Sequence, residues 1–452
     1  MSQKRNSRFA WMPKALRALS FSFDERHLTH FGGLVLMHRF CQQLHLRRRL
    51  QRQVQLPQRN ADYSAADLIL ALLYAMIAGL RRINKTELLQ YNGTFNDLLG
   101  LSRFPDQSTL RRFLQRLPTK SIRQLAGLHD RLRTQLFWVP EGSTSLVFDL
   151  DSVVLTLYGH QQGARVGYNP KKKGRRSYHP LLCFEAYRQE FWHGSLRPGD
   201  TSANTGVVFF FQRCLAKVPS SIARSRIRVR ADSGFFGGKF IASLENQGLG
   251  YVIVAKEYRP IKERARAARF RKLNRGFEVA EFRYQAHGWP RARRFVVMRR
   301  PIPEDPVEAK QLTLFKDRRY GYSVFVTNLD LEPWRVWKFY QPRAIIEKNI
   351  RELLYDLPLG KIPSGDWVAN VAFFQLVLLA CNLVHWFRRL CLPAAYRTAT
   401  VETVRTDFLV LPARMVSRAG RNVLQLPRDY FHQDAFAAAF EKAAKLRFPK
   451  KM

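Results

Sequence analysis

The chain has 452 residues, of which 76 are Lys or Arg and 35 are Asp or Glu, so its formal net charge at pH 7 is +41. Such a charge excludes most enzymes that act on small neutral substrates, and it predicts a polyanionic partner. Because 13% of the residues are aromatic and no long apolar span is present, nucleic acid fits that role better than a membrane surface.

The sequence gives no sign of a membrane or secreted protein. Its longest apolar stretch, 371–387, is interrupted by polar residues and falls short of the roughly 20 residues that cross a bilayer, so it predicts a buried helix. The N-terminus lacks the pattern of a secretion signal, which predicts a cytoplasmic protein. The five cysteines have the spacing of neither a zinc site nor a disulfide framework, so we expect them to be reduced core residues.

Residues 1–59 predict a basic N-terminal arm. Residues 1–53 contain eleven Lys or Arg and two acids, with Arg47, Arg48 and Arg49 in a row. A solvated arm and an arm that contacts DNA phosphates both agree with this composition, and the charge of the whole chain favours phosphate contact.

Residues 60–140 predict a helical DNA-binding region. Ser64 and Asp67 have the spacing of a capping box ahead of a long apolar run, which indicates a core helix. A later helix carries Arg111 and Arg112 on one face. The pattern is compatible with a helix-turn-helix, although any capped basic helix looks the same.

After residue 140 the pattern changes to short apolar runs typical of strands. Three such runs are followed by helix-like, strand-like, helix-like and strand-like segments, in this order: 145–155, 181–187, 190–196, 200–217, 227–231, 239–247 and 250–255. An antiparallel meander extended by parallel strands through helices is the order of a ribonuclease H-like core. We therefore expect an α/β fold with a ribonuclease H-like catalytic domain over 141–255 and 320–390.

A basic segment interrupts this domain. Residues 256–300 contain 15 Lys or Arg and four acids, together with strand-like stretches, so we expect a basic β-rich insertion over 256–319. Residues 320–328 predict a last strand, and 342–355 predict a long helix. The C-terminal region, 391–452, mixes helix and loop signals.

Two aspartates lie inside an apolar strand. Asp149 and Asp151 are two residues apart, so their side chains share one face of the sheet. Burial of unpaired carboxylates is costly or shifts them to the neutral acid, so this pair needs cations or a metal. Solvated aspartates at a strand end are the alternative, less favoured because the apolar pattern continues over 153–157.

Two further acids complete a candidate metal site. Asp232 ends the strand 227–231, and Glu347 lies on a predicted helix face with Arg343 and Arg351 at four-residue spacing. Alone, these would be an ordinary turn aspartate and an ordinary ion-paired helix. Two aspartates on neighbouring strands with a glutamate on a later helix are, however, the arrangement that holds two Mg²⁺ or Mn²⁺ ions for attack on a phosphodiester.

Three ordered blocks resemble the DDE transposases of the insertion-sequence 1380 family: 148–182, 230–235, and 343–353 together with 359–364 and 369–370. The resemblance implies metal-dependent cleavage at transposon ends and strand transfer into target DNA, with two Mg²⁺ or Mn²⁺ ions per active site. It also implies a homodimer that binds double-stranded DNA of the terminal inverted repeats and the target, at the nucleoid of a bacterial cell. A DNA-binding protein that has lost catalysis and a metal-dependent nuclease without strand transfer are the alternatives.

Carried over position by position, the resemblance implies Asp151, Asp232 and Glu347 as catalytic metal ligands. Asp149 is a further candidate ligand, and the residue that follows Asp151, a serine, is the reason for preferring Asp151.

The related Tyr-Arg-Glu-Lys signature falls on Tyr340, Arg343 and Glu347, but Leu354 occupies the position of its lysine. Nearby cations, among them Lys348, Arg351 and Lys361, could replace that lysine near the cut. The loop 168–178 packs five cations between two tyrosines, which favours DNA contact over a solvated hairpin. The predicted DNA-binding residues are Tyr168, Lys171, Lys172, Lys173, Arg175, Arg176, Tyr340, Arg343, Lys348, Arg351, Arg47, Arg48, Arg49, Arg111 and Arg112.

Overall fold

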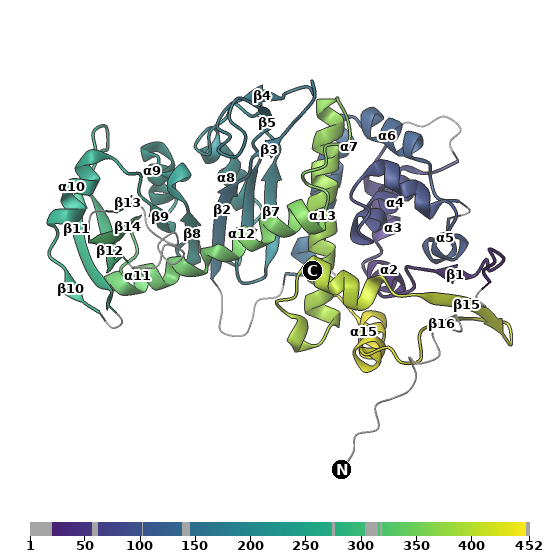
Figure 1. Ribbon diagram of the computed structural model, residues 1–452. Helices are drawn as coiled ribbons and strands as arrows, with labels where there is room; N and C mark the ends of the chain where they lie inside the picture. The colour runs from purple at the N-terminus through teal and green to yellow at the C-terminus, as the bar shows by residue number, and fades with distance from the viewer. Residues whose placement is uncertain are drawn as a thin grey trace, which may run out of the picture.

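The computed structural model describes residues 20–56, 62–101, 103–137, 145–273, 276–302, 315–316 and 319–448. Figure 1 shows a bundle of helices beside a broad mixed sheet, with the C-terminal segment packed under the bundle. The first 19 residues, part of the predicted basic arm, lie outside the described residues.

Five strands form the middle of the sheet. They are β2 (Leu146–Ser152), β6 (Leu181–Glu185), β7 (Glu190–Ser195), β8 (Ile227–Ala231) and β9 (Gly250–Val254). β2, β6 and β7 form an antiparallel meander, while β8 and β9 continue on the other side of β2 as parallel strands. Their spatial order, β9-β8-β2-β6-β7, is the ribonuclease H-like topology, so the predicted fold class is confirmed.

Further strands continue the same sheet beyond β9. They are β10 (Arg271–Lys272), β11 (Glu278–Tyr284), β12 (Arg293–Pro301), β13 (Phe315–Lys316) and β14 (Tyr320–Thr327), preceded by the helix α10 (Arg259–Ala267). β14 pairs antiparallel with β9, and β12 and β11 follow it outward. β14, which was expected to be the last strand of the catalytic domain, therefore lies between β9 and the strands of the expected insertion. Those strands extend the catalytic sheet and do not form a separate unit.

Helices cover both faces of the sheet. α8 (Val207–Leu215) and α9 (Gly238–Asn246) pack on the face that carries the apolar residues of β2. α11 (Pro333–Tyr340) and α12 (Ala344–Arg351) cross the opposite face, which carries the two aspartates of β2 (Figure 1). Single 3₁₀ and π turns flank α12, so the predicted long helix is present but composite.

The N-terminal part is a helical bundle. Its helices are α2 (Leu34–Gln43), α3 (Leu46–Gln53), α4 (Ala65–Ile77), α5 (Gly93–Leu99), α6 (Gln107–Arg116) and α7 (Thr119–Gln135). The predicted capping box begins α4, where Ser64 and Asp67 accept hydrogen bonds from each other's backbone N–H. α2 and α3 lie where a basic arm was expected; they join the core because apolar residues such as Leu36 and Phe40 line one face and are fully buried.

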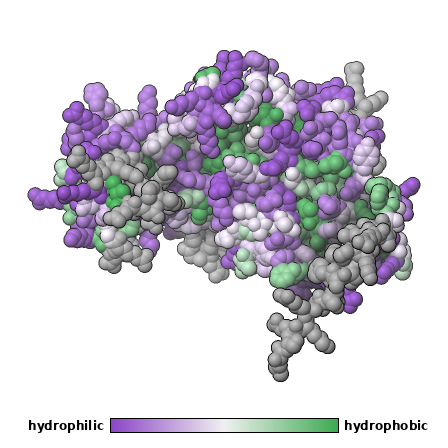
Figure 2. Space-filling model, in the orientation of Figure 1, coloured by the Kyte–Doolittle hydropathy of each residue, from purple (hydrophilic) through white to green (hydrophobic). Residues whose placement is uncertain are grey.

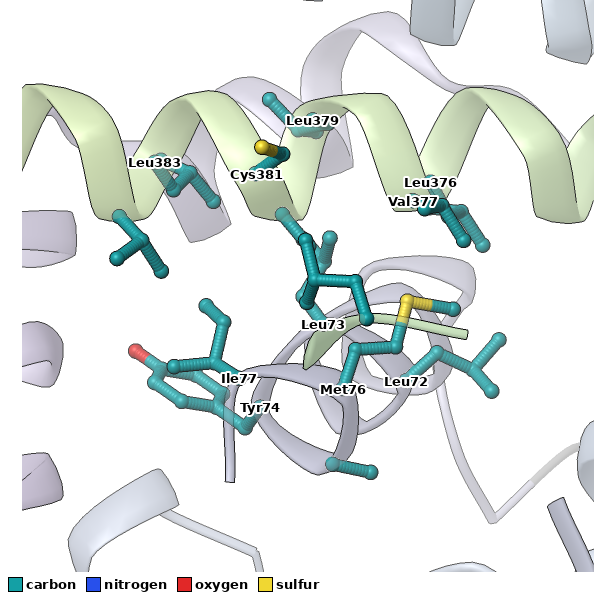
Figure 3. Close-up of a cluster of buried hydrophobic side chains, with 14 of the residues drawn as sticks. Leu72, Leu73, Tyr74, Met76, Ile77, Leu376, Val377, Leu379, Cys381 and Leu383 are labelled. Atoms are coloured by element: carbon teal, nitrogen blue, oxygen red, sulfur yellow. The ribbon is translucent and has the colours of Figure 1, made fainter. Parts of the chain in front are cut away.

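The molecule is assembled around α13 (Trp367–Cys391), the predicted buried helix. In the described part of the chain it is the one helix long and apolar enough to cross a membrane by length and composition alone, yet most of it is buried inside the protein. It packs against α4 and against β7, and so joins the helical bundle to the sheet. Figure 3 shows the apolar side chains of α4, among them Leu73 and Met76, beneath those of α13.

The C-terminal region closes against the bundle. It contains α14 (Val401–Val404), β15 (Ala413–Arg418), β16 (Arg421–Gln425) and α15 (Gln433–Lys445). β15 pairs with β1 (Leu28–Thr29) near the other end of the chain, and α15 packs against α2 and α13. A Cβ on Gly33 would lie 1.8 Å from the backbone oxygen of Phe408, so only glycine permits this approach.

Leu73→Ala tests the packing of α4 on α13. Leu73 is 1% exposed, and its truncation removes apolar contacts and leaves a cavity, so we expect the free energy of unfolding to fall by about 2–5 kcal/mol. Leu88→Ala is the control, since Leu88 is 64% exposed; we expect a change of about 0.5 kcal/mol or less. Denaturant unfolding measures both variants, and equal losses would contradict the assignment of this interface as core.

Candidate active site

Three predicted metal ligands meet at one edge of the sheet. Asp151 lies near the carboxyl end of β2 and Asp232 directly follows β8, so the parallel pairing of these strands brings both side chains to the same edge. Glu347 lies in the first turn of α12, which crosses the adjacent face. Asp232 Oδ1 accepts a hydrogen bond of 2.9 Å from the N–H of Gly234, which lacks the Cβ that would crowd this oxygen.

The guanidinium of Arg343 lies among these three carboxylates. Its Nη2 is 3.0 Å from Asp151 Oδ2 and 3.9 Å from Asp232 Oδ2, and its Nη1 is 3.1 Å from Glu347 Oε1. Arg343 is only 5% exposed. The residue predicted from the signature to contact DNA is therefore buried in the site, because the 3₁₀ turn ahead of α12 directs its side chain toward the strand ends.

The three acids differ in burial. The side chain of Asp151 is 11% exposed, against 43% for Asp232 and 63% for Glu347. Burial raises the pKa of Asp151 to about 7, while the positive charge of Arg343 opposes this shift and the negative charge of Asp232 adds to it. When all three are ionised, they outnumber the one guanidinium, so the site attracts cations.

The donor set fits a hard divalent cation. Carboxylate oxygens are the ligands that Mg²⁺ and Mn²⁺ prefer, and three of them converge on one positive charge here. Within the described residues, no three His, Cys, Asp or Glu side chains already stand at the separation that would hold an ion. In this structure the three acids do not form such a group, because the guanidinium of Arg343 occupies the space between them.

Asp149, the fourth candidate ligand, is engaged elsewhere. It is fully buried, and its two carboxylate oxygens accept hydrogen bonds of 2.6 and 2.8 Å from Nε and Nη2 of Arg230 on β8. Nη1 of Arg230 donates to the backbone oxygen of Phe339 in α11 at 2.8 Å. Both oxygens of Asp149 are thus committed to a buried, bidentate ion pair, which lies two residues before the metal candidates on each strand.

His179, which the sequence indicates as a structural or DNA-contacting residue and not as a metal ligand, contacts the site. Its Nε2 lies 3.0 Å from Ser152 Oγ, next to Asp151, and its Nδ1 lies 2.6 Å from the backbone oxygen of Thr201. Burial lowers the pKa of His179, which favours the neutral imidazole. No spacing in the sequence identifies Ser152 as its partner, because 27 residues separate the two.

The predicted DNA-binding loop projects from a small sheet beside the carboxylates. This sheet, in the order β3-β5-β4, consists of β3 (Leu155–Thr156), β4 (Arg165–Val166) and β5 (Arg176–Tyr178). The five cations and Tyr168 are exposed. Tyr178 is instead buried and donates its hydroxyl to the backbone oxygen of Gln162 at 2.6 Å, so one tyrosine faces solvent, not two.

The other predicted DNA-binding residues divide by exposure. Arg48, Arg111, Arg112 and Arg351 are exposed, and Arg49 is half-buried. Hydrophilic side chains cover most of the face drawn in Figure 2, with smaller hydrophobic patches between them. The side chains of the four exposed arginines are open to solvent, as the predicted contact with DNA phosphates requires.

Several of these residues also contact the protein itself. Arg111 donates to the backbone oxygen of Pro363 at 3.4 Å, and Arg112 donates to Ser108 and Thr109. Arg47 pairs with Asp67 at the start of α4. Lys348 donates to the backbone oxygen of Thr398 at 2.8 Å. Tyr340 is 8% exposed and packs on Phe325, with ring centroids 4.9 Å apart, because α11 lies flat on the sheet.

Sequence comparison assigns the chain to a known group. A family model described as "Transposase DDE domain group 1" matches residues 12–448, nearly the whole chain. No curated protein matches the chain.

Solved structures of three transposases are among those with weak similarity to the chain. The piggyBac transposase synaptic complex with hairpin DNA is 14% identical, with a TM-score of 0.42 over 91% of each chain. The Drosophila P element transposase strand transfer complex is 13% identical, with a TM-score of 0.25 over 47% of this chain and 45% of that one. The pre-cleavage Mos1 transpososome is 11% identical, with a TM-score of 0.17 over 44% and 60%. The family assignment rests on the sequence match alone.

Arg230→Met tests the buried ion pair. Because it leaves the carboxylate of Asp149 buried without its partner, we expect the free energy of unfolding to fall by about 3–5 kcal/mol. Arg228→Met is the matched control on the same strand face; Arg228 is half-buried, and its loss should cost about 1 kcal/mol or less. Urea unfolding measures both, and a mild effect at Arg230 would show that Asp149 does not depend on it.

Asp151→Asn tests the raised pKa of Asp151. Between the ordinary aspartate pKa of about 4 and the native value of about 7, the native state binds a proton that the unfolded state has lost, so this group lowers stability as pH rises through that window. The asparagine variant lacks this loss. Its stability relative to the parent protein, measured by urea unfolding with a chelator present, should therefore increase from pH 5 to pH 8; a constant difference would contradict the shift.

Proposed function

We propose how this protein works from one premise: the chain belongs to the family of transposases with a group 1 DDE domain. It is a DNA transposase, an enzyme that cleaves DNA and transfers the cut strand to new DNA. Enzymes of this family use divalent metal ions. The assignments that follow concern which residues of this chain carry out each part of that reaction.

We assign the metal ions to Asp151, Asp232 and Glu347, two ions of Mg²⁺ or Mn²⁺ per site. The observation that carries this assignment is the convergence of the three carboxylates on Arg343 at the carboxyl end of β2 and β8. Ions bound there would supply an activated water or 3′-hydroxyl and stabilise the leaving oxygen. Asp149 is left out, since Arg230 takes both its oxygens.

The chain's own residues divide this work. Asp151 is the rigid member, buried and fixed by the N–H of Ser152, which donates to its Oδ1 at 2.7 Å. Asp232 and Glu347 are open to solvent and so to the DNA backbone. Arg343 keeps the three like charges close together in the free protein, and its guanidinium would have to leave the space between them for the ions to bind.

DNA reaches this site along the exposed cations. We propose that the loop 168–176 holds phosphates beside the cut, because β5 leads from it directly to His179, which touches Ser152. Arg351 is exposed one helical turn after Glu347, whereas Leu354 packs against the core, so Arg351 takes the phosphate contact expected of the signature lysine. Arg48, Arg111 and Arg112 extend the basic surface over the helical bundle, and two copies of the chain act on the two transposon ends.

Alanine variants of the three acids test the assignment. Asp151→Ala, Asp232→Ala and Glu347→Ala should each slow metal-dependent cleavage of a transposon-end duplex by at least about 100-fold, about 2.7 kcal/mol of activation free energy. DNA affinity should change little, since Lys and Arg supply it. Asp330→Ala removes an exposed acid outside the site and should leave both quantities unchanged.

The same assay separates the competing assignments. A variant that keeps the parental cleavage rate identifies a residue that is not a ligand. Binding without any metal-dependent cleavage would identify a DNA-binding protein that has lost catalysis. Cleavage without joining of the released end to a target duplex would identify a nuclease.

A further inference from the structure

The ribbon formed by β15 and β16 has no role in the function proposed above. Its two strands pair antiparallel and are closed by a tight turn at Ala419 and Gly420, which have φ of 48° and 72°. Figure 1 shows the ribbon extending beyond the helical bundle, on the side away from the catalytic part of the sheet. Its base is fixed, because β15 pairs with β1 and Ala413 is buried.

The ribbon carries several positive charges and no acidic residue of its own. The segment 408–428 contains four arginines and no Asp or Glu. Arg414, near the base, pairs with Glu25 at 2.8 Å. Arg418 and Arg421, at the tip, are exposed, and neither has a carboxylate partner among the residues that the structure describes.

The pairing register places these two tip cations against each other. Arg418 is directly opposite Arg421 across the ribbon, and Arg414 lies on the same face. Like charges at directly opposed positions destabilise an antiparallel pair. The free protein therefore keeps two like charges opposed at the exposed tip of the ribbon, and an anion between the two guanidinium groups would offset their repulsion.

The shape of the ribbon suits duplex DNA. The major groove, about 12 Å wide, admits a two-stranded ribbon. Strands of five to six residues span about 17–20 Å, enough to reach across the phosphates of one groove. An apolar protein partner fits poorly, because Val423, at 38%, is the one large apolar side chain of the ribbon that is classed as exposed.

We propose that the β15–β16 ribbon is a second DNA-binding site, which binds backbone phosphates of duplex DNA through Arg418 and Arg421. It rests on the proposed function in one respect, that duplex DNA is the substrate held at both places. Because the ribbon lies away from the carboxylates, it contributes to affinity and not to the chemical step.

The test compares two double variants of the full chain, R418Q/R421Q and the control R224Q/R226Q. Arg224 and Arg226 are also exposed, and they precede β8 at the end of that strand opposite to Asp232. For a transposon-end duplex, the slope of log affinity against log salt should be about 1.8 smaller for R418Q/R421Q, since two phosphate contacts are lost. The control should keep the parental slope.

Two further measurements separate this site from the catalytic one. At saturating DNA, the metal-dependent cleavage rate of R418Q/R421Q should equal that of the parent, and its DNA-free melting temperature should not fall. An unchanged slope, or an equal fall in both double variants, overturns the proposal. If the parent protein shows no cleavage, the proposed function fails, but the salt slope still decides whether the ribbon binds DNA.

Discussion

The ion pair between Arg230 and Asp149 joins the three chain segments from which the active site is built. In the parallel pairing of β2 and β8 these residues are direct neighbours, and Arg230 also reaches the backbone of α11. Each segment then continues into one of the three proposed metal ligands: Asp151, Asp232 and Glu347. A buried carboxylate is tolerated only with its partner, so the pair sets the register of the strands and the depth at which the following helix crosses them.

Arg343 also pairs with carboxylates, at the rim of the sheet, but most of its partners are open to solvent. Arg230 and Asp149 are both buried, so their pair is closed to any other ligand. Arg343 is buried too, but two of its three carboxylate partners are open to solvent. The inner pair therefore serves the structure, whereas the outer cluster leaves oxygen atoms accessible to metal and DNA.

Much of this architecture could be predicted from the sequence, because strand periodicity and the order of elements are local signals. The meander, the two parallel strands and the candidate acids follow from such signals, whereas the preference for Asp151 over Asp149 came from the family resemblance. The roles of Asp149 and Arg343 do not follow from local signals, since each depends on a partner far along the chain. Arg230, inside the strand Ile227–Ala231, nevertheless indicated such a partner in the sequence. A buried arginine needs a carboxylate, and Asp149 on an earlier strand was available. The pairing of β15 with β1 escaped prediction because it joins segments near the two ends of the chain. The ribbon itself is a local hairpin, whose turn at Ala419 and Gly420 was a usable signal.

The position of Glu347 in the chain also affects how the enzyme is made. Glu347 follows Asp232 by 115 residues (347 − 232), which include the strands that extend the sheet. At about 5–20 residues per second, a ribosome takes roughly 6–23 seconds to add that segment. During this time the nascent chain already carries two of the three acids and the cations of the loop 168–176, but it has neither α12 nor the cation among the carboxylates. A chain that ends before α12 therefore lacks one of the three proposed metal ligands and the guanidinium among them.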